Sequence, residues 1–342
     1  MDAQDLRTGR RVCIKRANNK SQEIEIGRYL SSEDSPRHPK NHCPPVLDSF
    51  HDPDDPETRY IVMPLLRPFD DPDFEVVGEV VDFVTQLLEV QLDLFADLTA
   101  PNIMMDGLPI FPNGWHFVVP GFSEDGANIL KPLSRIDHPV RYYIIDFDSS
   151  VRIQPGESSI RRGLGGRDSD PPELSNTRIP FDQYKLDVFT LGKVFLKEFK
   201  LKFAGLKFLA TITEVMMIKD FAHRPTAREA LQHWYKVKAG IDVGRARWRL
   251  RKSKESLGEQ VIGATRDGFQ SLKYILKKGD DLDLPISALS TAAIRPGYVS
   301  EAFTPPLILV IDGEHNAQTA PTLTFCQPSF KKGANDSDTA VE

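Results

Sequence analysis

The stretch Tyr142-Tyr143-Ile144-Ile145-Asp146-Phe147-Asp148 decides how this 342-residue chain is interpreted. Four consecutive aromatic and β-branched residues predict a short buried strand. A carboxylate that directly follows such a strand is fixed by a rigid element, while the next loop keeps it accessible, which suits a metal ligand. The alternative is an aspartate that caps a turn. Because the strand that leads to Asp146 is predicted to be apolar and buried, the metal-ligand interpretation is favoured over the turn cap.

Two segments near the N-terminus add groups that suit phosphate chemistry. Val12-Cys13-Ile14-Lys15 lies in a predicted strand over residues 10–16, and a helix is expected from Ser21 to Leu30. Lys15 is either an edge residue with its ammonium in solvent or a phosphate-binding lysine held by Glu23 of the helix. Glu25 would face a different direction on that helix.

A third segment, Asp97-Leu98-Thr99-Ala100-Pro101-Asn102, precedes the apolar residues 103–105. The Asp97 carboxylate could accept a hydroxyl proton, and Asn102 could hold a divalent cation, because hard oxygen ligands suit magnesium. Aspartate and asparagine are also ordinary turn residues, and the segment taken alone favours that interpretation.

The remaining pattern predicts a small sheet followed by helices. Strands are expected at Val46–Phe50 and Tyr60–Leu66, on either side of an acidic turn, and a helix from Val76 to Val90. Residues 107–138 are loop-like, and residues 154–180 are expected to form a long exposed segment. Two closing helices are expected. One places Val188, Leu191, Phe195 and Phe199 on one face, and the other begins at the capping box Thr226-x-x-Glu229.

In this order, the polar segments resemble the protein kinase superfamily, whose strand lysine, helix glutamate, catalytic-loop aspartate and asparagine, and metal-binding aspartate follow the same sequence. Pro171-Pro172-Glu173 is similar to the A-P-E element that ends the activation segment. Asp187–Gly192 is similar to the start of the buried central helix, and Arg224-Pro225-Thr226 to the arginine that pairs with the A-P-E glutamate. Val62–Phe69 and Pro101–Asp106 are similar to phrases in a divergent set of fungal kinase-like proteins.

The resemblance implies an α+β, two-lobed, protein-kinase-like fold. Residues 1–66 would form a truncated, mostly β N-lobe without the Gly-rich loop, and residues 67–240 a larger, mostly helical C-lobe. Residues 241–342 would be a C-terminal tail, with a basic helix over residues 245–278 followed by a disordered end.

The same resemblance implies a binding site for ATP and Mg²⁺. Lys15, anchored by Glu23, would contact the phosphates, while Asn102 and Asp146 would hold the metal. Asp97 would orient the attacking hydroxyl of a protein substrate.

The adenine side of the implied site comes from the segment that links the two lobes. Met63 would lie at the back of the nucleotide pocket, and Pro64 to Leu66, including Leu65 and Leu66, would form the hinge.

Several positions depart from the family pattern. No G-x-G-x-x-G loop precedes Lys15, and the eleven residues before Val12 are expected to be too few for the missing strand and turn. The His-Arg pair before the catalytic aspartate is replaced by Phe95-Ala96, and the lysine two residues after it by Thr99. The glycine after Asp146-Phe147 is replaced by Asp148.

These departures leave two functions open. Losing the phosphate lid and one cation removes about 2–4 kcal/mol of transition-state stabilisation each, so only slow phosphoryl transfer is expected. The alternative is a catalytically inactive pseudokinase that acts as an interaction scaffold for protein partners. The chain between the helix ending at Val90 and Asp97 is also shorter than the family pattern by roughly two helical turns.

Composition limits the other classes of function. The formal net charge of −6 arises entirely before residue 241, so nucleic acid binding is not expected. A local basic run, Arg245 to Lys254 with Trp248 inside it, would be a solvated helix face, touch an anionic surface or dock against the acidic part of the chain.

No apolar run is long enough to span a membrane, and no signal peptide pattern is present, so a cytoplasmic or nuclear protein is expected. The three cysteines favour neither a disulfide nor a zinc site. His38, His42 and Cys43 are expected to belong to a loop without a metal.

Overall fold

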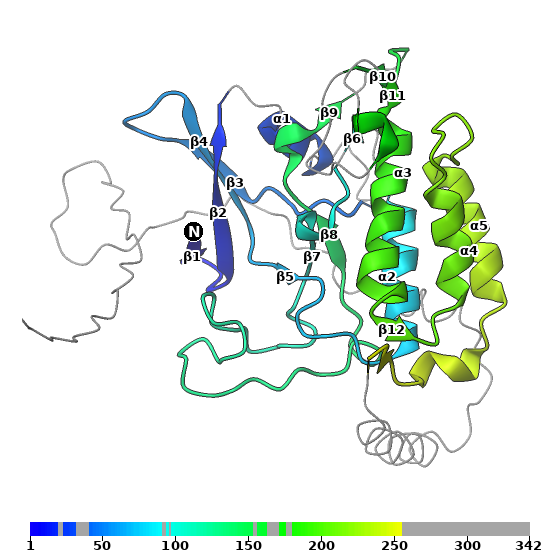
Figure 1. Ribbon diagram of the computed structural model, residues 1–342. Coiled ribbons are helices and arrows are strands. Elements are labelled where there is room, and N and C mark those ends of the chain that lie inside the picture. Colours follow the sequence, from blue (N-terminus) through cyan, green and yellow to red (C-terminus); the bar gives the residue numbers. More distant parts are fainter. Residues whose placement is uncertain are drawn as a thin grey trace, which may run out of the picture.

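The fold mixes small antiparallel sheets with helices. The structure is a computed structural model that describes residues 1–19, 23–31, 41–90, 94–95, 97–152, 156–162, 171–175 and 180–254. Five α-helices fall within these residues, and every strand pair in them is antiparallel. Figure 1 shows the largest sheet on one side of the molecule and the bundle of α2 to α5 on the other.

The largest sheet has the strand order β1-β2-β4-β3, formed by β1 (Asp2–Gln4), β2 (Arg11–Asn18), β3 (Asp48–His51) and β4 (Thr58–Pro64). Helix α1 (Glu23–Ser31) follows β2, close to its predicted position; the expected start at residues 21 and 22 lies outside the described residues. The predicted hairpin across the acidic turn is confirmed by the pairing of β3 with β4. The sequence therefore predicted three of the four strands and missed β1.

The two faces of this sheet have different neighbours, because side chains alternate along a strand. Val12 and Ile14 pack with Tyr60 and Val62 on one face. Ala17 and Ile61 pack on the other face with Ile24 of α1. Lys15 shares its face with Ala17, so the alternation directs the lysine toward α1.

The N-terminal residues correct one expectation. The eleven residues before Val12 do build a strand and a turn, because β1 needs only three residues and the turn is tight. The Asp5 carboxylate accepts hydrogen bonds from the Arg7 amide (2.9 Å) and the Thr8 hydroxyl (2.7 Å). Gly9 closes the turn with φ +68°, a left-handed conformation that glycine adopts without a steric penalty.

A three-stranded sheet, β5-β7-β8, connects the largest sheet to the helices. It consists of β5 (Arg67–Pro68), β7 (Ile103–Met105) and β8 (Tyr142–Ile144). The strand predicted from Tyr142 is thus confirmed and ends at Ile144. Three two-stranded pairs complete the strands: β6 (Leu94–Phe95) with β9 (Val151–Arg152), β10 (Ile160–Arg161) with β11 (Phe181–Asp182), and β12 (Phe203–Ala204) with β13 (Arg251–Lys252).

The helices enclose the main hydrophobic core. They are α2 (Val77–Glu89), α3 (Gln183–Val194), which continues as a π-helical segment, η4 (Phe195–Lys200), α4 (Phe208–Met216) and α5 (Ala227–Ala239). The core contains a cluster of aromatic rings from α2, β8 and η4, in which Phe83 lies 4.8 Å from Tyr142 and 5.1 Å from Phe199, centroid to centroid. The predicted apolar face of α3 and η4 is buried as expected.

Helix α4 was not predicted from the sequence. Its N-cap position is Lys207, which makes no side-chain capping bond, so the usual start signal is absent. The capping box predicted for α5 is present: the Thr226 hydroxyl accepts from the Glu229 amide, and the Glu229 carboxylate accepts from the Thr226 amide at 2.8 Å. No helix among the described residues is long and apolar enough to cross a membrane.

The long segment between β7 and β8 is fixed to the core by one buried arginine. Arg67 of β5 is 2% exposed, and its guanidinium carbon lies 4.3 Å from the Phe111 ring centroid and 5.1 Å from that of Trp115. The same group donates to the Asp71 carboxylate and to the Pro120 carbonyl oxygen, each at 2.8 Å. The loop-like insertion is therefore packed against the body of the molecule.

The basic helix expected from residue 245 is wrong over the described residues. Arg245–Lys254 contains the end of a 3-10 turn, η5 (Val243–Arg247), and strand β13, and residues 255–278 of the expected helix lie outside the described part. The arginines at 245, 247, 249 and 251 alternate with period two, which fits an extended segment better than a helix. Backbone bonds to Glu75 and Val77 and the burial of Leu250 hold this segment against the start of α2.

The contact between α2 and α5 contains a titratable group with a shifted pKa. Burial raises the pKa of Asp82 to about 6, although a 2.7 Å hydrogen bond from Gln86 and the charge of Lys238 oppose the shift. The folded protein therefore binds this proton more tightly than the unfolded chain. The stability that this group contributes is fully present below its ordinary pKa of 3.8 and is lost as the pH rises through about 6.

We expect Asp82→Asn, which keeps the hydrogen-bond acceptor without the charge, to be more stable than wild type at pH 7.5. This advantage should shrink as the pH falls below 6. Urea denaturation between pH 4.5 and 8 measures the difference. Asp54→Asn, at an exposed position, is the control and should show a constant offset from wild type. An Asp82→Asn advantage that does not change with pH would contradict this assignment.

Candidate active site

Lys15 joins two carboxylates from distant parts of the chain. Its ammonium forms an ion pair with Glu23 of α1 and donates a 2.7 Å hydrogen bond to Oδ1 of Asp146, which follows β8. The side chain of Glu23 is 7% exposed, that of Asp146 18% and that of Lys15 30%. The interpretation of Lys15 as a solvent-facing edge residue is therefore wrong, and the pairing expected between Lys15 and Glu23 is present.

The electrostatics of this cluster favour a charged lysine. Burial disfavours the Lys15 ammonium, but the hydrogen bonds and charges of Asp146 and Glu23 outweigh that cost and raise the pKa of Lys15. Burial also raises the pKa of Glu23, with the nearby charges of Asp146 and Asp148 adding to the effect, while Lys15 opposes it. Lys15 is thus a fixed cation between two carboxylates.

Asp97 and Asn102 lie in a second part of the site, a buried loop that precedes β7. Asn102 occupies the end of the short 3-10 helix η1 (Ala100–Asn102), and its Nδ2 donates to the Asp97 carbonyl oxygen at 3.0 Å. The Leu98 amide donates to Oδ1 of Asp187 on α3 at 3.3 Å. The sequence pattern indicates Asp187 only as the start of a helix and contains no signal for its role in holding this loop.

The antiparallel pairing of β7 with β8 brings the two parts together. Ile103 is opposite Ile144, and the next residues continue the ladder, because the Ile145 amide donates to the Asn102 carbonyl oxygen at 2.9 Å. Asn102 is therefore one residue away from Asp146 across the ladder. Because Nδ2 of Asn102 is engaged by Asp97, its Oδ1 is the atom suited to a cation.

The backbone conformation singles out the same two aspartates. Asp97 (φ +48°) and Asp146 (φ +67°) are the two non-glycine residues with positive φ in the described part of the chain. A left-handed backbone costs a residue other than glycine on the order of 1–3 kcal/mol, and such residues cluster at functional sites. Asp97 and Asp146, which the sequence indicates as a hydroxyl-orienting residue and a metal ligand, are thus also the residues with a strained backbone.

The predicted nucleotide-pocket residues lie along the end of β4. Met63 packs against the Ala17, Ile24 and Ile61 cluster beside α1. Leu65 and Leu66 are the two residues between β4 and β5, and Leu65 packs against the main core. This places them at the connection between the largest sheet and the rest of the molecule.

The capacity of this site for a metal depends on groups outside the protein. No group of three or more His, Cys, Asp or Glu side chains suited to a metal occurs in the described ranges. Asn102 and Asp146 could supply two oxygens, and Mg²⁺ is commonly bound by one or two carboxylates together with substrate phosphates and water. The donor set fits Mg²⁺ held jointly with a nucleotide and does not fit a metal bound by the protein alone.

The ion pair expected between Glu173 and Arg224 is present. Arg224 donates from Nη1 at 2.6 Å and from Nη2 at 3.2 Å to the two carboxylate oxygens of Glu173, in the bidentate geometry of a strong pair. Both side chains are almost fully buried, so residues 171–175 correct the expectation of an exposed segment over 154–180. Removing one partner of such a pair typically costs about 3–5 kcal/mol.

The segment before Asp97 is only partly described. Residues 91–93 and Ala96 lie outside the described part, while β6 at Leu94–Phe95 pairs with β9. The short connection between α2 and Asp97 thus contains a strand, β6, that pairs with β9. Asp148 lies in the 3-10 helix η2 (Phe147–Ser149), which contacts α1, and is exposed.

The histidine and cysteine group has a structural role where it is described. Nδ1 of His42 lies 2.7 Å from the Tyr142 carbonyl oxygen, and burial lowers the pKa of His42 to about 4, so the neutral ring donates this bond. Cys43 is buried, and burial raises the pKa of its thiol. His38 lies outside the described residues. His42 and Cys43 lie in an irregular segment between α1 and β3, as the loop interpretation predicts.

The basic run after α5 pairs with acidic residues of the same chain. Arg247 forms a 2.6 Å ion pair with Asp137, and Lys252 a 2.9 Å pair with Asp73. Trp248 is exposed and lies under the Arg245 guanidinium at 4.8 Å. Of the three expectations for this run, docking against the acidic part of the chain matches these contacts.

No protein-family model matches this chain, and no curated protein matches it. The function is therefore argued from the geometry above.

A double-mutant cycle on Lys15→Met and Glu23→Gln should measure the coupling within the cluster. Because Lys15→Met leaves the buried Glu23 carboxylate without its cation, we expect a coupling energy on the order of 1–3 kcal/mol. Chemical denaturation of the four proteins provides the values. The exposed pair Arg16 and Asp55 supplies the control cycle, in which we expect a much smaller coupling. Equal couplings in both cycles would contradict a special role for Lys15.

Proposed function

We propose that this chain is a protein-kinase-like domain of two-lobed form that binds ATP and Mg²⁺. In this proposal the β1–β4 sheet with α1 is the smaller lobe and the part built on α2 to α5 is the larger one. The observation that carries the proposal is the bridge from Lys15 to both Glu23 and Asp146, residues that are eight and 131 positions away in the sequence. A strand lysine paired with a helix glutamate, close to a carboxylate that follows a strand, is the arrangement that phosphate and metal binding in this superfamily uses.

Each residue of the site has a role in this proposal. Lys15, oriented by Glu23, contacts the phosphates, and Asn102 and Asp146 hold Mg²⁺. Asp97 accepts a hydrogen bond from the acceptor hydroxyl and orients it for attack. A bound MgATP supplies the phosphoryl group and the neutralising cation. The protein contributes positioning and charge, without a covalent step on its own side chains.

The adenine site in this proposal lies at the end of β4. Met63 borders the back of the nucleotide pocket, and Leu65 and Leu66 belong to the connection between the lobes. The packing of Met63 beside α1 and the position of Leu65 between two sheets support this arrangement.

The Lys15–Asp146 hydrogen bond affects how the nucleotide binds. Oδ1 of Asp146, the proposed metal ligand, is already occupied by the Lys15 ammonium. The Asp146 carboxylate has a second oxygen, Oδ2, that can bind a metal, whereas a contact between Lys15 and a phosphate oxygen would compete with this hydrogen bond. This competition lowers the apparent affinity for the nucleotide, so we expect weak nucleotide binding.

The second candidate function is a pseudokinase scaffold for protein partners. Thr99 provides no cation where the family has a lysine, and the exposed Asp148 adds negative charge beside Asp146. Both changes disfavour phosphoryl transfer without preventing the fold. A protein substrate is the partner in the first case and a scaffold partner in the second. Contact of Arg245 to Lys254 with an anionic surface is less favoured, because two of its cations already form ion pairs within the chain.

Thermal unfolding with MgATP tests nucleotide binding. At a nucleotide concentration of 100 Kd, the wild type should gain about 2.7 kcal/mol, a rise in Tm of several degrees. Asp146→Asn should lose most of this shift, because it removes a charge from the proposed metal ligand. Asp54→Asn, at an exposed position in the acidic turn before β4, is the matched control and should keep the shift. Mg²⁺ alone and ATP with EDTA serve as ligand controls. No shift in the wild type, or the same shift in Asp146→Asn, would sink the proposal.

Phosphate transfer to a generic Ser/Thr substrate separates the enzyme from the scaffold. If the chain is an enzyme, Asp97→Asn should lower the rate by about 10²–10⁴-fold, because the variant cannot act as a general base. Asparagine also tolerates the left-handed backbone at this position, so the fold should be preserved. Indistinguishable rates for the wild type and this variant would favour the pseudokinase scaffold.

A further inference from the structure

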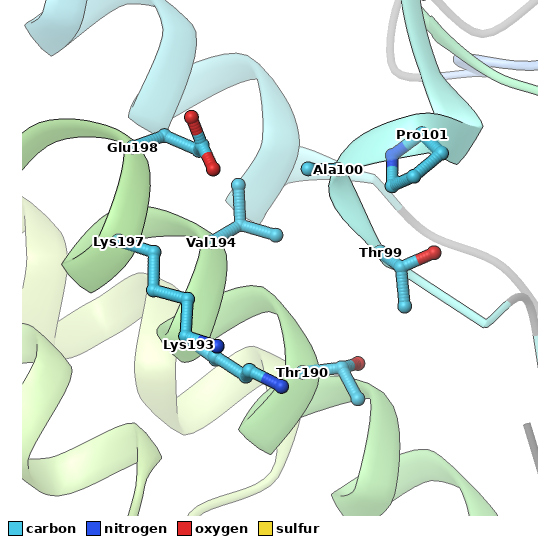
Figure 2. Close-up of a pocket in the computed structure, with 8 residues that line it drawn as sticks. All are labelled: Thr99, Ala100, Pro101, Thr190, Lys193, Val194, Lys197 and Glu198. Carbon is cyan, nitrogen blue, oxygen red and sulfur yellow. The ribbon is translucent and has the colours of Figure 1, made fainter. Parts of the chain in front are cut away.

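A pocket of about 270 Å³ lies beside the loop that contains Asp97. One wall is formed by Thr99, Ala100 and Pro101 at the start of η1, and the other by α3 and the beginning of η4. Figure 2 shows Val194 on the helical wall, with Ala100 and Pro101 opposite it. The pocket is separate from the Lys15 cluster and has no role in the site described above.

The charged residues of this pocket are mainly cationic. Lys193 and Lys197 lie one helical turn apart, and in Figure 2 their side chains extend along the same side of the pocket. The single acidic lining residue, Glu198, is paired with Lys202 outside the lining. Both lysines also interact with other groups of the chain while they line the pocket.

The neutral lining residues suit a side chain with a charged end. Val194, Ala100 and Pro101 offer an apolar surface to methylene groups, while Thr99 and Thr190 add hydroxyl groups. The Thr190 hydroxyl already donates to the Asp187 carbonyl oxygen at 3.0 Å, whereas no hydrogen bond from the Thr99 side chain is recorded among the described residues. Thr99 is therefore the hydroxyl donor that a bound anion would meet.

The pocket is close to the proposed catalytic carboxylate. Thr99 is two residues from Asp97, and its amide donates to the Asp97 carbonyl oxygen at 2.7 Å. An extended peptide advances about 3.3 Å per residue. If the hydroxyl of an acceptor residue reaches Asp97, a side chain one to three residues away reaches the pocket.

We propose that this pocket binds an anionic side chain of the acceptor peptide, within three residues of the hydroxyl that receives the phosphate. The anion is either the carboxylate of Asp or Glu or the phosphate of a residue that is already phosphorylated. This inference rests on the proposed function and adds the substrate class: peptides with acidic residues next to the acceptor.

Peptide binding to the full chain without nucleotide tests this inference. Fluorescein-labelled peptides with a central serine would carry Glu, phosphoserine, Gln or Lys at the flanking positions, and anisotropy titrations give Kd. We expect the wild type to bind the Glu or the phosphoserine peptide at least fivefold more tightly than the Gln peptide, and the Lys peptide most weakly. A stronger preference for phosphoserine than for Glu would identify phosphate as the source of the anion.

Variants of the two lysines assign the preference to the pocket. Lys193→Gln with Lys197→Gln should abolish the preference, and Lys197→Glu should shift it toward the Lys peptide. Lys193→Arg with Lys197→Arg keeps the charge and should retain it, which guards against loss through misfolding. Lys236→Gln, at an exposed position on α5, is the matched control and should behave as the wild type.

The inference is overturned if the wild type binds no peptide, if it binds the Glu and Lys peptides equally, or if the preference persists in the double Gln variant. These outcomes are distinct from failure of the proposed function. MgATP binding without a charge preference removes this inference alone, whereas a charge preference without MgATP binding leaves an anionic peptide site on a scaffold.

Discussion

The ammonium of Lys15 is the group on which the arrangement of the site depends. It connects β2 of the largest sheet to α1 and to the segment that follows β8, and it does so by two charged hydrogen bonds. Burying this cation together with its two anionic partners costs far less free energy than burying either carboxylate without a cation. Neither of these partners can move far without leaving another charge uncompensated, so the three elements keep their relative positions.

A second set of contacts determines where Asp97 and Asn102 lie. The ladder between β7 and β8 places Asn102 beside Ile145, and Asp187 of α3 holds the loop from the other side. The loop is thus fixed by a sheet and by a helix. The left-handed conformations of Asp97 and Asp146 persist because the surrounding backbone is fixed in this way. The strain and the chemistry therefore occur at the same two residues.

Much of this arrangement follows from local pattern. The alternation of β2 predicted that Lys15 lies in a strand, the apolar run before Asp146 predicted β8, and the capping box predicted the start of α5. The polar residues of the site were found because each one lies within a predicted strand or helix or close to the end of one. The pairing of Glu173 with Arg224 was expected from the resemblance alone.

Other features depend on long-range contacts that a local pattern does not contain. Helix α4 lacks a capping signal and is held by packing against α3 and α5. The basic run after α5 predicts a helix, whereas Arg245 and Arg247 lie in the 3-10 turn η5 and residues 248–250 run along residues 75–77. Nothing local indicates that Lys15 would meet Asp146, since 131 residues separate them. The pocket beside Thr99 was missed because its walls come from segments about 90 residues apart.

The buried guanidinium of Arg67 has a consequence for how this chain can vary. Its five N–H donors are satisfied in part by a carbonyl of the β7–β8 insertion, and its flat faces are covered by two aromatic rings of the same insertion. Shortening the insertion past Phe111 or Trp115 would uncover a face of this permanent positive charge and leave the Asp71 carboxylate as its charged partner. We therefore expect the β7–β8 insertion and Arg67 to be kept together or lost together in evolution.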